Sequence, residues 1–324
     1  MAERGIGPSS SRWRRYGPGM LFSFWANVGN PWSVVLDGCK HAEATGWDGI
    51  WVADHFMPNI EGFAGEEDEA ELGPVMEAWT IIGALGAAVP RVRIGTMVTG
   101  NTYRHPAVLA NMAATADHIS GGRIVLGIGA GWQENEHARY GMELGSRGGR
   151  SDRFEEACEI IKGLFANDRT SFDGEYYNLD GAPLEPKPVQ DPMPLMIGGG
   201  GEKRTMRTAA RFADEWNIWA RPEDMRQKLP ILHRHCEDVG RDPAEIHVSA
   251  CAMLVITDSE EHTEKVAGRM AHRGGLVGTV DQLRATIAEY EELGIDEIVV
   301  PDFTMTPENR ADTLDRFRAE VIDA

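Results

Sequence analysis

Asp54 and His55 stand side by side just after an apolar run, residues 48–52. Histidine can accept or donate a proton near neutral pH, and a neighbouring carboxylate can fix its tautomer or accept from a ring N–H of a ligand. The pair therefore indicates proton transfer beside a bound ligand, with His55 as the candidate catalytic residue. The residues alone leave open a second interpretation, in which His55 is a structural histidine bonded to backbone carbonyls.

Four consecutive glycines follow another apolar run and precede Lys203 and a helical pattern: Gly198, Gly199, Gly200 and Gly201. Their backbone N–H groups, a helix N-terminus and a lysine together favour binding of a phosphate. The GK[ST] ending of a P-loop is missing. A second glycine-containing segment, residues 127–136, has no third glycine at the spacing of a Rossmann fingerprint. Glycines that merely turn the chain are the alternative interpretation at both places.

Three tryptophans lie where apolar runs end or just beyond them, and could wall a pocket for a planar ring: Trp25, Trp132 and Trp219. Taken singly, each is more often a core residue. We find no HExxH motif, and the acidic runs resemble solvated faces, so we expect no metal site. No GxSxG motif supplies the nucleophile of a hydrolase.

To bring His55, the glycines and the tryptophans together, the fold must place the carboxyl ends of several strands on one face. Eight apolar runs alternate with amphipathic helical patterns, at residues 20–25, 48–52, 92–98, 123–127, 194–197, 214–219, 246–254 and 297–300. Eight such units predict an α/β fold, a (β/α)8 TIM barrel with loop insertions at the C-terminal face, where barrel enzymes carry their sites. We expect one domain over residues 20–324, after a flexible N-terminal extension, residues 1–19.

Three segments interrupt this alternation and predict functional loops. Residues 57–73 are rich in glycine and acidic side chains, residues 170–192 indicate a hairpin excursion, and residues 270–279 contain two adjacent glycines. The N-terminal extension lacks the apolar stretch and cleavage site of an export signal.

Composition narrows the function classes. The 324 residues carry a formal net charge of −19, which would repel nucleic acid and anionic membranes, and no apolar run approaches the length of a bilayer span. The four cysteines are far apart and lack CxxC spacing, which favours a reducing cytoplasm over a disulfide framework. We therefore expect a cytoplasmic protein whose partner is a small-molecule substrate.

Several motifs in the same order resemble the luciferase-like flavin and deazaflavin enzymes, namely residues 52–56, 95–106 and 126–141. Within that superfamily, residues 198–217, 240–245 and 278–300 resemble the actinobacterial coenzyme F420-dependent oxidoreductases. The resemblance covers residues 20–301. It implies hydride transfer with F420 as cofactor and a homodimer. An FMN-dependent monooxygenase that uses reduced flavin and oxygen is the first alternative, and a relative that has lost its chemistry is the second.

The resemblance also implies roles for individual residues. Asp54 would contact the deazaflavin ring, His55 would lie near the hydride-transfer centre, and a non-prolyl cis peptide would join Met97 to Val98. The implied cofactor contacts are Thr96, Met97, Val98, Thr99, Ala130 and Asn135, with phosphate contacts from residues 198–201. The F420-dependent glucose-6-phosphate dehydrogenases have a glutamate where this chain has Trp132, which favours a less polar substrate here.

Overall fold

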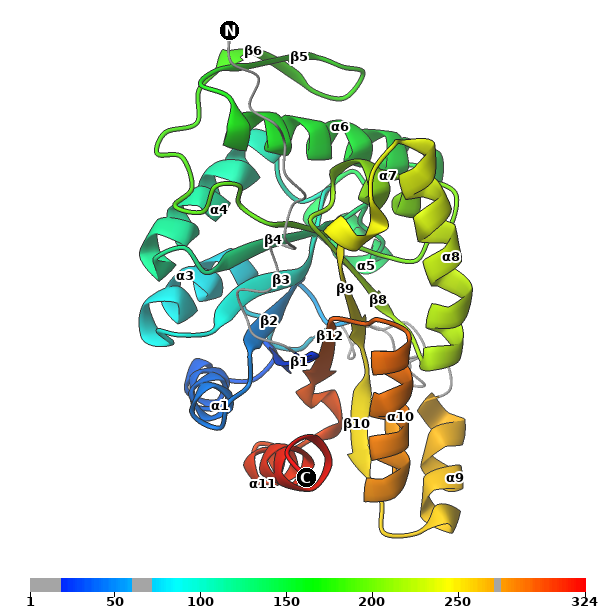
Figure 1. The fold of residues 1–324 in the computed structure, drawn as a ribbon. Helices are drawn as coiled ribbons and strands as arrows, with labels where there is room; N and C mark the ends of the chain where they lie inside the picture. Colours follow the sequence, from blue (N-terminus) through cyan, green and yellow to red (C-terminus); the bar gives the residue numbers. More distant parts are fainter. Residues whose placement is uncertain (1–18, 60–71, 271–274) are drawn as a thin grey trace, which may run out of the picture.

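The computed structural model describes residues 19–59, 72–270 and 275–324, and within them eight parallel strands close into a barrel (Figure 1). The order around the barrel is β1-β12-β9-β8-β7-β4-β3-β2. The strands are β1 Leu21–Ala26, β2 Gly49–Asp54, β3 Arg93–Gly100, β4 Ile124–Gly129, β7 Leu195–Gly198, β8 Glu215–Trp219, β9 His247–Cys251 and β12 Glu297–Pro301. The prediction of a TIM barrel is therefore confirmed.

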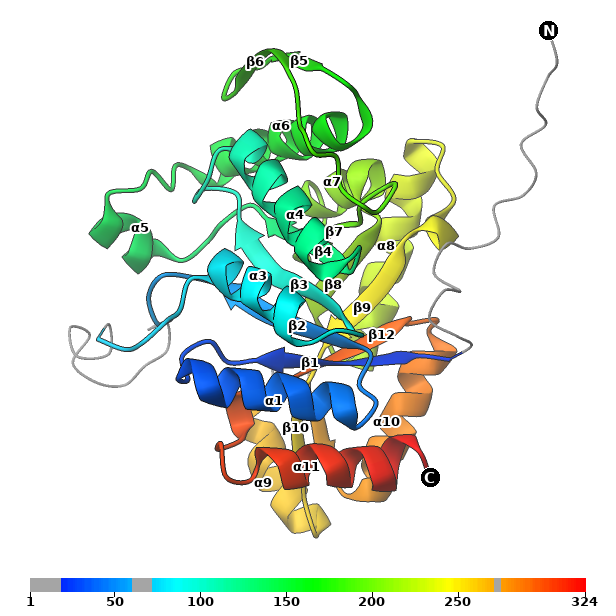
Figure 2. The ribbon, with the colours of Figure 1, turned by 90° about the vertical axis from the view of Figure 1, so that its left-hand side faces the viewer.

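Helices surround the barrel and cover its outer face (Figures 1 and 2). The α-helices of the described residues are α1 Trp32–Ala44, α3 Ala78–Ala88, α4 Pro106–Ser120, α5 Glu134–Tyr140, α6 Arg147–Ala166, α7 Thr205–Phe212, α8 Pro222–Asp238, α9 Glu260–Met270, α10 Val280–Glu292 and α11 Arg310–Phe317. Because both faces of the barrel strands are covered, the strand residues are almost all buried, as in other parallel sheets. Short α5 stands away from the barrel wall in Figure 2.

Two insertions interrupt the β/α alternation. The predicted hairpin excursion is confirmed by β5 Thr170–Asp173 and β6 Asn178–Ala182, which pair antiparallel. The prediction of one continuous strand over residues 246–254 is wrong, because the chain leaves the barrel after β9 and continues as β10 Met253–Ile256. This strand pairs in parallel with β11 Gly275–Gly278, part of a segment that we predicted to be a loop. Pairing with a distant strand overrides the local glycine signal.

Some predictions fall outside the described residues. These are the extension over residues 1–18, most of the acidic loop over residues 57–73, and residues 271–274. Among the described residues, no helix is long and apolar enough to cross a bilayer. All four cysteines are free and buried.

The middle of the barrel interior is apolar. Trp51, Met97, Val125, Met196, Cys251 and Val299 pack there below Trp25. Gly95 makes room for Trp51, because a Cβ at Gly95 would lie 2.4 Å from the Trp51 ring.

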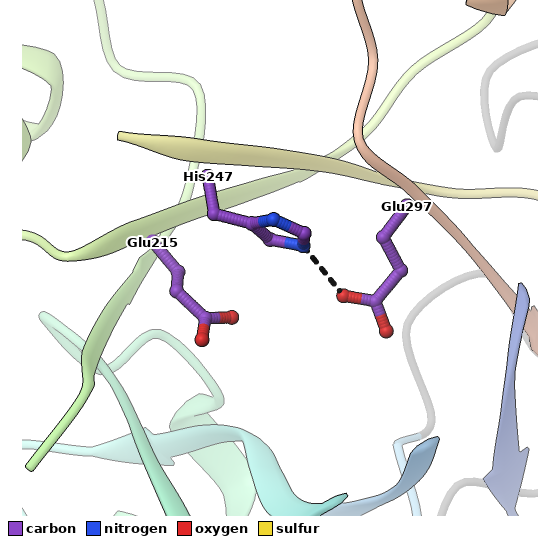
Figure 3. A group of neighbouring side chains, drawn as sticks. All are labelled: Glu215, His247 and Glu297. Atoms are coloured by element: carbon purple, nitrogen blue, oxygen red, sulfur yellow. Dashed lines mark hydrogen bonds and ion pairs between the residues drawn. The ribbon is translucent and has the colours of Figure 1, made fainter. Parts of the chain in front are cut away.

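A buried ion network closes the amino end of the barrel. Glu215, His247 and Glu297 begin β8, β9 and β12, and Figure 3 shows their side chains turned toward one another. His247 Nε2 lies 3.0 Å from a Glu297 oxygen. The Arg93 guanidinium contacts Glu215 and lies 3.4 Å from Glu297. Trp51 Nε1 donates to the second Glu297 oxygen at 3.1 Å.

Arg93 and His247 supply positive charge beside the two carboxylates of this network, and they oppose the rise that burial causes in the pKa of Glu215. Burial alone would raise the pKa of Glu297, but Arg93 and His247 outweigh it and lower that pKa to about 2. Burial alone would lower the pKa of His247, but its Glu297 partner and the nearby Glu215 raise it. Glu215, His247 and Glu297 have the spacing of a metal-ligand set. We interpret them as a structural network, because the guanidinium already supplies the positive charge.

Candidate active site

A cavity of about 870 Å³ opens at the carboxyl ends of the barrel strands. Its lining includes residues from six strand ends or the loops that follow them: Trp25, His55, Met97, Gly129, Gly198 and Trp219. The volume lies within the range of small-molecule and cofactor sites. Barrel enzymes carry their chemistry on this face, so the cavity is the candidate active site.

The end of β3 forms part of the cavity lining. The peptide bond between Met97 and Val98 is cis, as the resemblance implies. Val98 packs against two glycines of neighbouring strands. A Cβ at Gly198 would lie 2.8 Å from Val98, and one at Gly129 would lie 3.0 Å from it. Glycine at these two positions therefore lets Val98 lie close to β4 and β7.

His55 lies in the lining and contacts a buried carboxylate. Its Nδ1 atom is 2.9 Å from Glu136 Oε1, and the Glu136 side chain is fully buried. The Tyr103 hydroxyl donates to the same Glu136 oxygen and lies 3.2 Å from His55 Nδ1. Burial alone would raise the pKa of Glu136, but hydrogen bonds from His55, Tyr103 and the Phe56 amide lower it. Glu136 is therefore ionised at neutral pH.

Asp54 contacts an arginine rather than His55. Its two oxygens accept from Arg104 at 2.6 and 3.2 Å, and Arg104 also contacts Glu77 at the N-terminus of α3. Burial raises the pKa of Asp54, and the Arg104 guanidinium opposes that rise. Asp54 is fully buried and is not among the residues that line the cavity. These ion pairs connect the end of β2, where Asp54 lies, with Arg104 in the loop after β3 and with Glu77 at the N-terminus of α3.

The glycine loop forms one end of the cavity. Gly198, Gly199 and Gly200 line it together with Thr205, the first residue of α7. Gly199 has a φ of +123°, which glycine adopts readily. A Cβ at Gly200 would lie at ordinary van der Waals distances from Ile218 (3.6 Å) and Lys228 (3.9 Å), so no neighbouring atom crowds this glycine. Within the described residues, the Gly200 amide has no hydrogen-bond partner.

Lys228 from α8 reaches this loop. Its Nζ donates to the Gly200 carbonyl at 3.3 Å and to Glu202 at 2.7 Å. Arg221, at the start of the same helix, also lines the cavity and pairs with Asp224. Lys203 is exposed, outside the lining. The cations that face the cavity therefore come from the following β/α unit.

Aromatic rings wall the rest of the cavity. The centroids of the Trp25 and Trp219 rings are 5.5 Å apart. The Trp132 ring packs edge-on against the His55 ring, with 5.5 Å between their centroids. Ile218 adds an aliphatic surface. The cavity therefore combines a polar glycine-loop end with a largely apolar wall around His55.

A sequence model of the luciferase-like monooxygenase family matches residues 19–275, well over half of the chain. The chain belongs to this family. An F420-dependent glucose-6-phosphate dehydrogenase from Kineococcus radiotolerans is 34% identical over 218 residues, which cover 65% of this chain and 60% of the dehydrogenase. The chain spans about half to 60% of the length of the curated F420-dependent relatives that it matches.

Solved structures share the fold of this luciferase-like protein. An F420-dependent secondary alcohol dehydrogenase, solved with an F420-acetone adduct, has a TM-score of 0.79 at 22% identity, covering 94% of this chain and 99% of that one. The EDTA monooxygenase of Chelativorans sp. has a TM-score of 0.76 at 15% identity, covering 93% and 92%. At these identities the likeness supports the fold alone.

In this luciferase-like chain, the structure brings together many of the predicted site residues but not all of them. His55, Met97, Val98, Ala130, the glycines 198–200 and the three tryptophans line one cavity. Thr96 and Thr99 lie behind it, where Thr96 donates to the Gly127 carbonyl and Thr99 accepts from Trp79. Asn135 donates to the Pro58 carbonyl. Gly201 also lies outside the lining.

Sequence reasoning missed Tyr103, Arg104, Glu136, Asn217 and Lys228. Glu136 lies at the end of the glycine segment that we singled out, but acidic residues are common in the first turn of a helix and nothing marks it locally. Tyr103 and Arg104 belong to the stretch that carries the family resemblance. Asn217, which lines the cavity from β8, ends another such stretch, whereas Lys228 has no local signal because it approaches the cavity from α8.

Proposed function

We propose that this chain is an F420-dependent oxidoreductase that transfers a hydride to or from a small organic substrate. The observation that carries the proposal is one cavity in which a proton-transfer histidine, an aromatic wall and a glycine loop meet at the carboxyl face of the barrel. Curated relatives named for F420 favour this cofactor. An FMN-dependent monooxygenase is the second candidate, supported by structural neighbours such as the EDTA monooxygenase.

The cavity residues fit a phosphate-bearing cofactor. Among the described residues the Gly200 amide, in the cavity lining, has no hydrogen-bond partner and suits a phosphate oxygen, and Lys228 lies within reach of the same loop. Met97 and Val98 offer a surface for a flat ring, next to the tryptophan walls. We propose that Asp54, Thr96 and Thr99 support this surface from behind, and that Gly201, Lys203 and Asn135 shape the surrounding loops.

When bound, F420 accepts or donates a hydride, so the substrate must lose or gain a proton as well. We assign that proton to His55, whose ring faces the cavity with no hydrogen-bond partner for Nε2 among the described residues. The aromatic walls exclude water and favour a weakly polar alcohol, ketone or imine. As parts of the same proposal we retain one domain over residues 20–324, a cytoplasmic location and a homodimer, the last measurable by light scattering.

We expect the purified protein to bind oxidised F420 more tightly than FMN. Quenching of tryptophan fluorescence reports binding directly, because three tryptophans line the cavity. Tighter binding of FMN, together with substrate-dependent oxygen uptake when reduced FMN is supplied, would replace the leading proposal by the monooxygenase.

We expect Lys228→Gln to weaken F420 binding about tenfold. A charge-assisted hydrogen bond is worth roughly 1.5–3 kcal/mol, and because Lys228 already pairs with Glu202 the lower end applies. Fluorescence titration at two salt concentrations measures the change. Lys203→Gln is the matched control, since it removes one positive charge from the same loop outside the cavity lining. If both variants lose F420 affinity equally, net charge governs binding rather than a contact at Lys228.

A further inference from the structure

We propose that Glu136 is a positioning residue that holds His55 in one tautomer, with Nδ1–H toward Glu136 and Nε2 free to exchange a proton in the cavity. The proposal deepens the proposed function and rests on it for the role of His55 in turnover. The tautomer of His55 can be tested in the ligand-free protein, independently of any cofactor.

Glu136 accepts hydrogen bonds from several directions. The Phe56 amide donates at 2.7 Å and the Met57 amide at 3.3 Å, both to Oε2. The other oxygen, Oε1, faces His55 Nδ1 and the Tyr103 hydroxyl. These partners come from the loops after β2 and β3, whereas Glu136 lies on α5 after β4. One carboxylate thus joins three consecutive β/α loops beneath the His55 ring.

The ionisation of Glu136 determines which histidine nitrogen carries hydrogen. An ionised carboxylate can only accept, so each neighbour must donate to it. The hydrogen bonds from His55, Tyr103 and the Phe56 amide outweigh the burial of Glu136 and hold its pKa below the usual value. His55 Nδ1 therefore carries hydrogen. The Tyr103 hydroxyl gives its own hydrogen to Glu136, so its oxygen can also accept from Nδ1.

The second nitrogen of His55 is then left for chemistry. The ring is enclosed edge-on by Trp132 at 5.5 Å and Tyr103 at 6.4 Å, which opposes a ring flip. In the neutral ring Nε2 holds a lone pair and can take a proton from a substrate hydroxyl. In the charged ring Nε2–H can return that proton, and the Glu136 carboxylate stabilises the positive charge. The same arrangement of carboxylate, imidazole and reacting group operates in hydrolase triads.

Glu136→Gln separates positioning from simple loop support. Glutamine keeps the length of the side chain and an oxygen that can accept from the Phe56 and Met57 amides. Its NH₂ group then faces His55 Nδ1 as a donor, so Nδ1 must become an acceptor and the hydrogen must move to Nε2. Loop support is preserved, while the tautomer of His55 is reversed.

The tautomer is read by ¹⁵N NMR of the ligand-free protein, at a pH where the ring is neutral, with His55→Gln used to assign the signal. We expect Nδ1–H in the parental protein and Nε2–H in Glu136→Gln. Turnover should fall by about 100-fold or more, since a wrong tautomer in a triad has cost roughly 10,000-fold. F420 affinity should stay within a few-fold. Glu134→Gln, an exposed glutamate on the same helix, should change neither tautomer nor turnover.

Two results would overturn this inference. One is an Nε2–H tautomer in the parental protein, which needs no variant and therefore decides the matter even if Glu136→Gln fails to fold. The other is a folded Glu136→Gln protein with parental turnover and an unchanged tautomer. Failure of the protein to bind F420 would instead refute the proposed function, and the tautomer measurement would still stand.

Discussion

His55→Ala is expected to lower turnover by about 100- to 10,000-fold while F420 affinity stays within a few-fold of the parental value. The variant removes the group that would exchange a proton with the substrate, and it leaves the Met97–Val98 surface and the glycine loop intact. Stopped-flow absorbance of the deazaflavin measures the rate, after a screen of ketones, imines and alcohols with both redox states of the cofactor has identified a substrate.

The control for this variant is His233→Ala, an exposed histidine on α8 with no hydrogen bond among the described residues. It tests whether loss of any imidazole alters the assay. A His55→Ala enzyme that turns over at the parental rate across pH would make His55 a structural residue. The proton donor would then be sought among other groups of the cavity, with Tyr103 first.

Arg93→Met is expected to lower the free energy of unfolding by about 3–5 kcal/mol, because it leaves buried carboxylates without their main cation. Methionine retains much of the packing of the arginine stem but loses the cation–π contact between the guanidinium and the Trp51 ring. Urea unfolding followed by tryptophan fluorescence measures the loss. The network should contribute its full stability between about pH 4.3 and 6.5, so the loss should be measured there. Above the ordinary glutamate pKa, Glu297 is ionised, and below the ordinary histidine pKa, His247 is protonated.

Arg91→Met is the matched control. Arg91 is two residues away and 67% exposed, and its ion pair with Glu43 spans 3.6 Å. Glu43 is buried, but the Arg91 and Val92 amides also donate to it and water screens the exposed guanidinium, so this variant should unfold close to the parental midpoint. Adding Glu215→Gln to Arg93→Met should recover part of the lost stability, because the Glu215 carboxylate loses its hydrogen-bonded cation in Arg93→Met, whereas Glu297 keeps its contact with His247. Equal losses for Arg93→Met and Arg91→Met would refute the role of the network.

The barrel could be predicted from the sequence because its signals are local. Apolar runs alternate with helical patterns, and parallel strands bring their carboxyl ends to one face whatever the details of packing. That rule alone placed His55, the glycine loop and the tryptophans at the same end. The strands β10 and β11 were missed because their pairing joins segments on either side of α9, and no local pattern records that contact.

The partner of His55 was decided by tertiary structure. Sequence proximity suggested Asp54, but successive side chains near the end of a strand point to opposite sides, so Asp54 meets Arg104 while His55 meets Glu136. The cation that contacts the glycine loop was also decided by tertiary structure. Lys203 is next to the loop in sequence, yet Lys228 contacts it from a neighbouring helix. Residue types and the common face follow from local pattern, whereas side-chain partners depend on how distant elements pack.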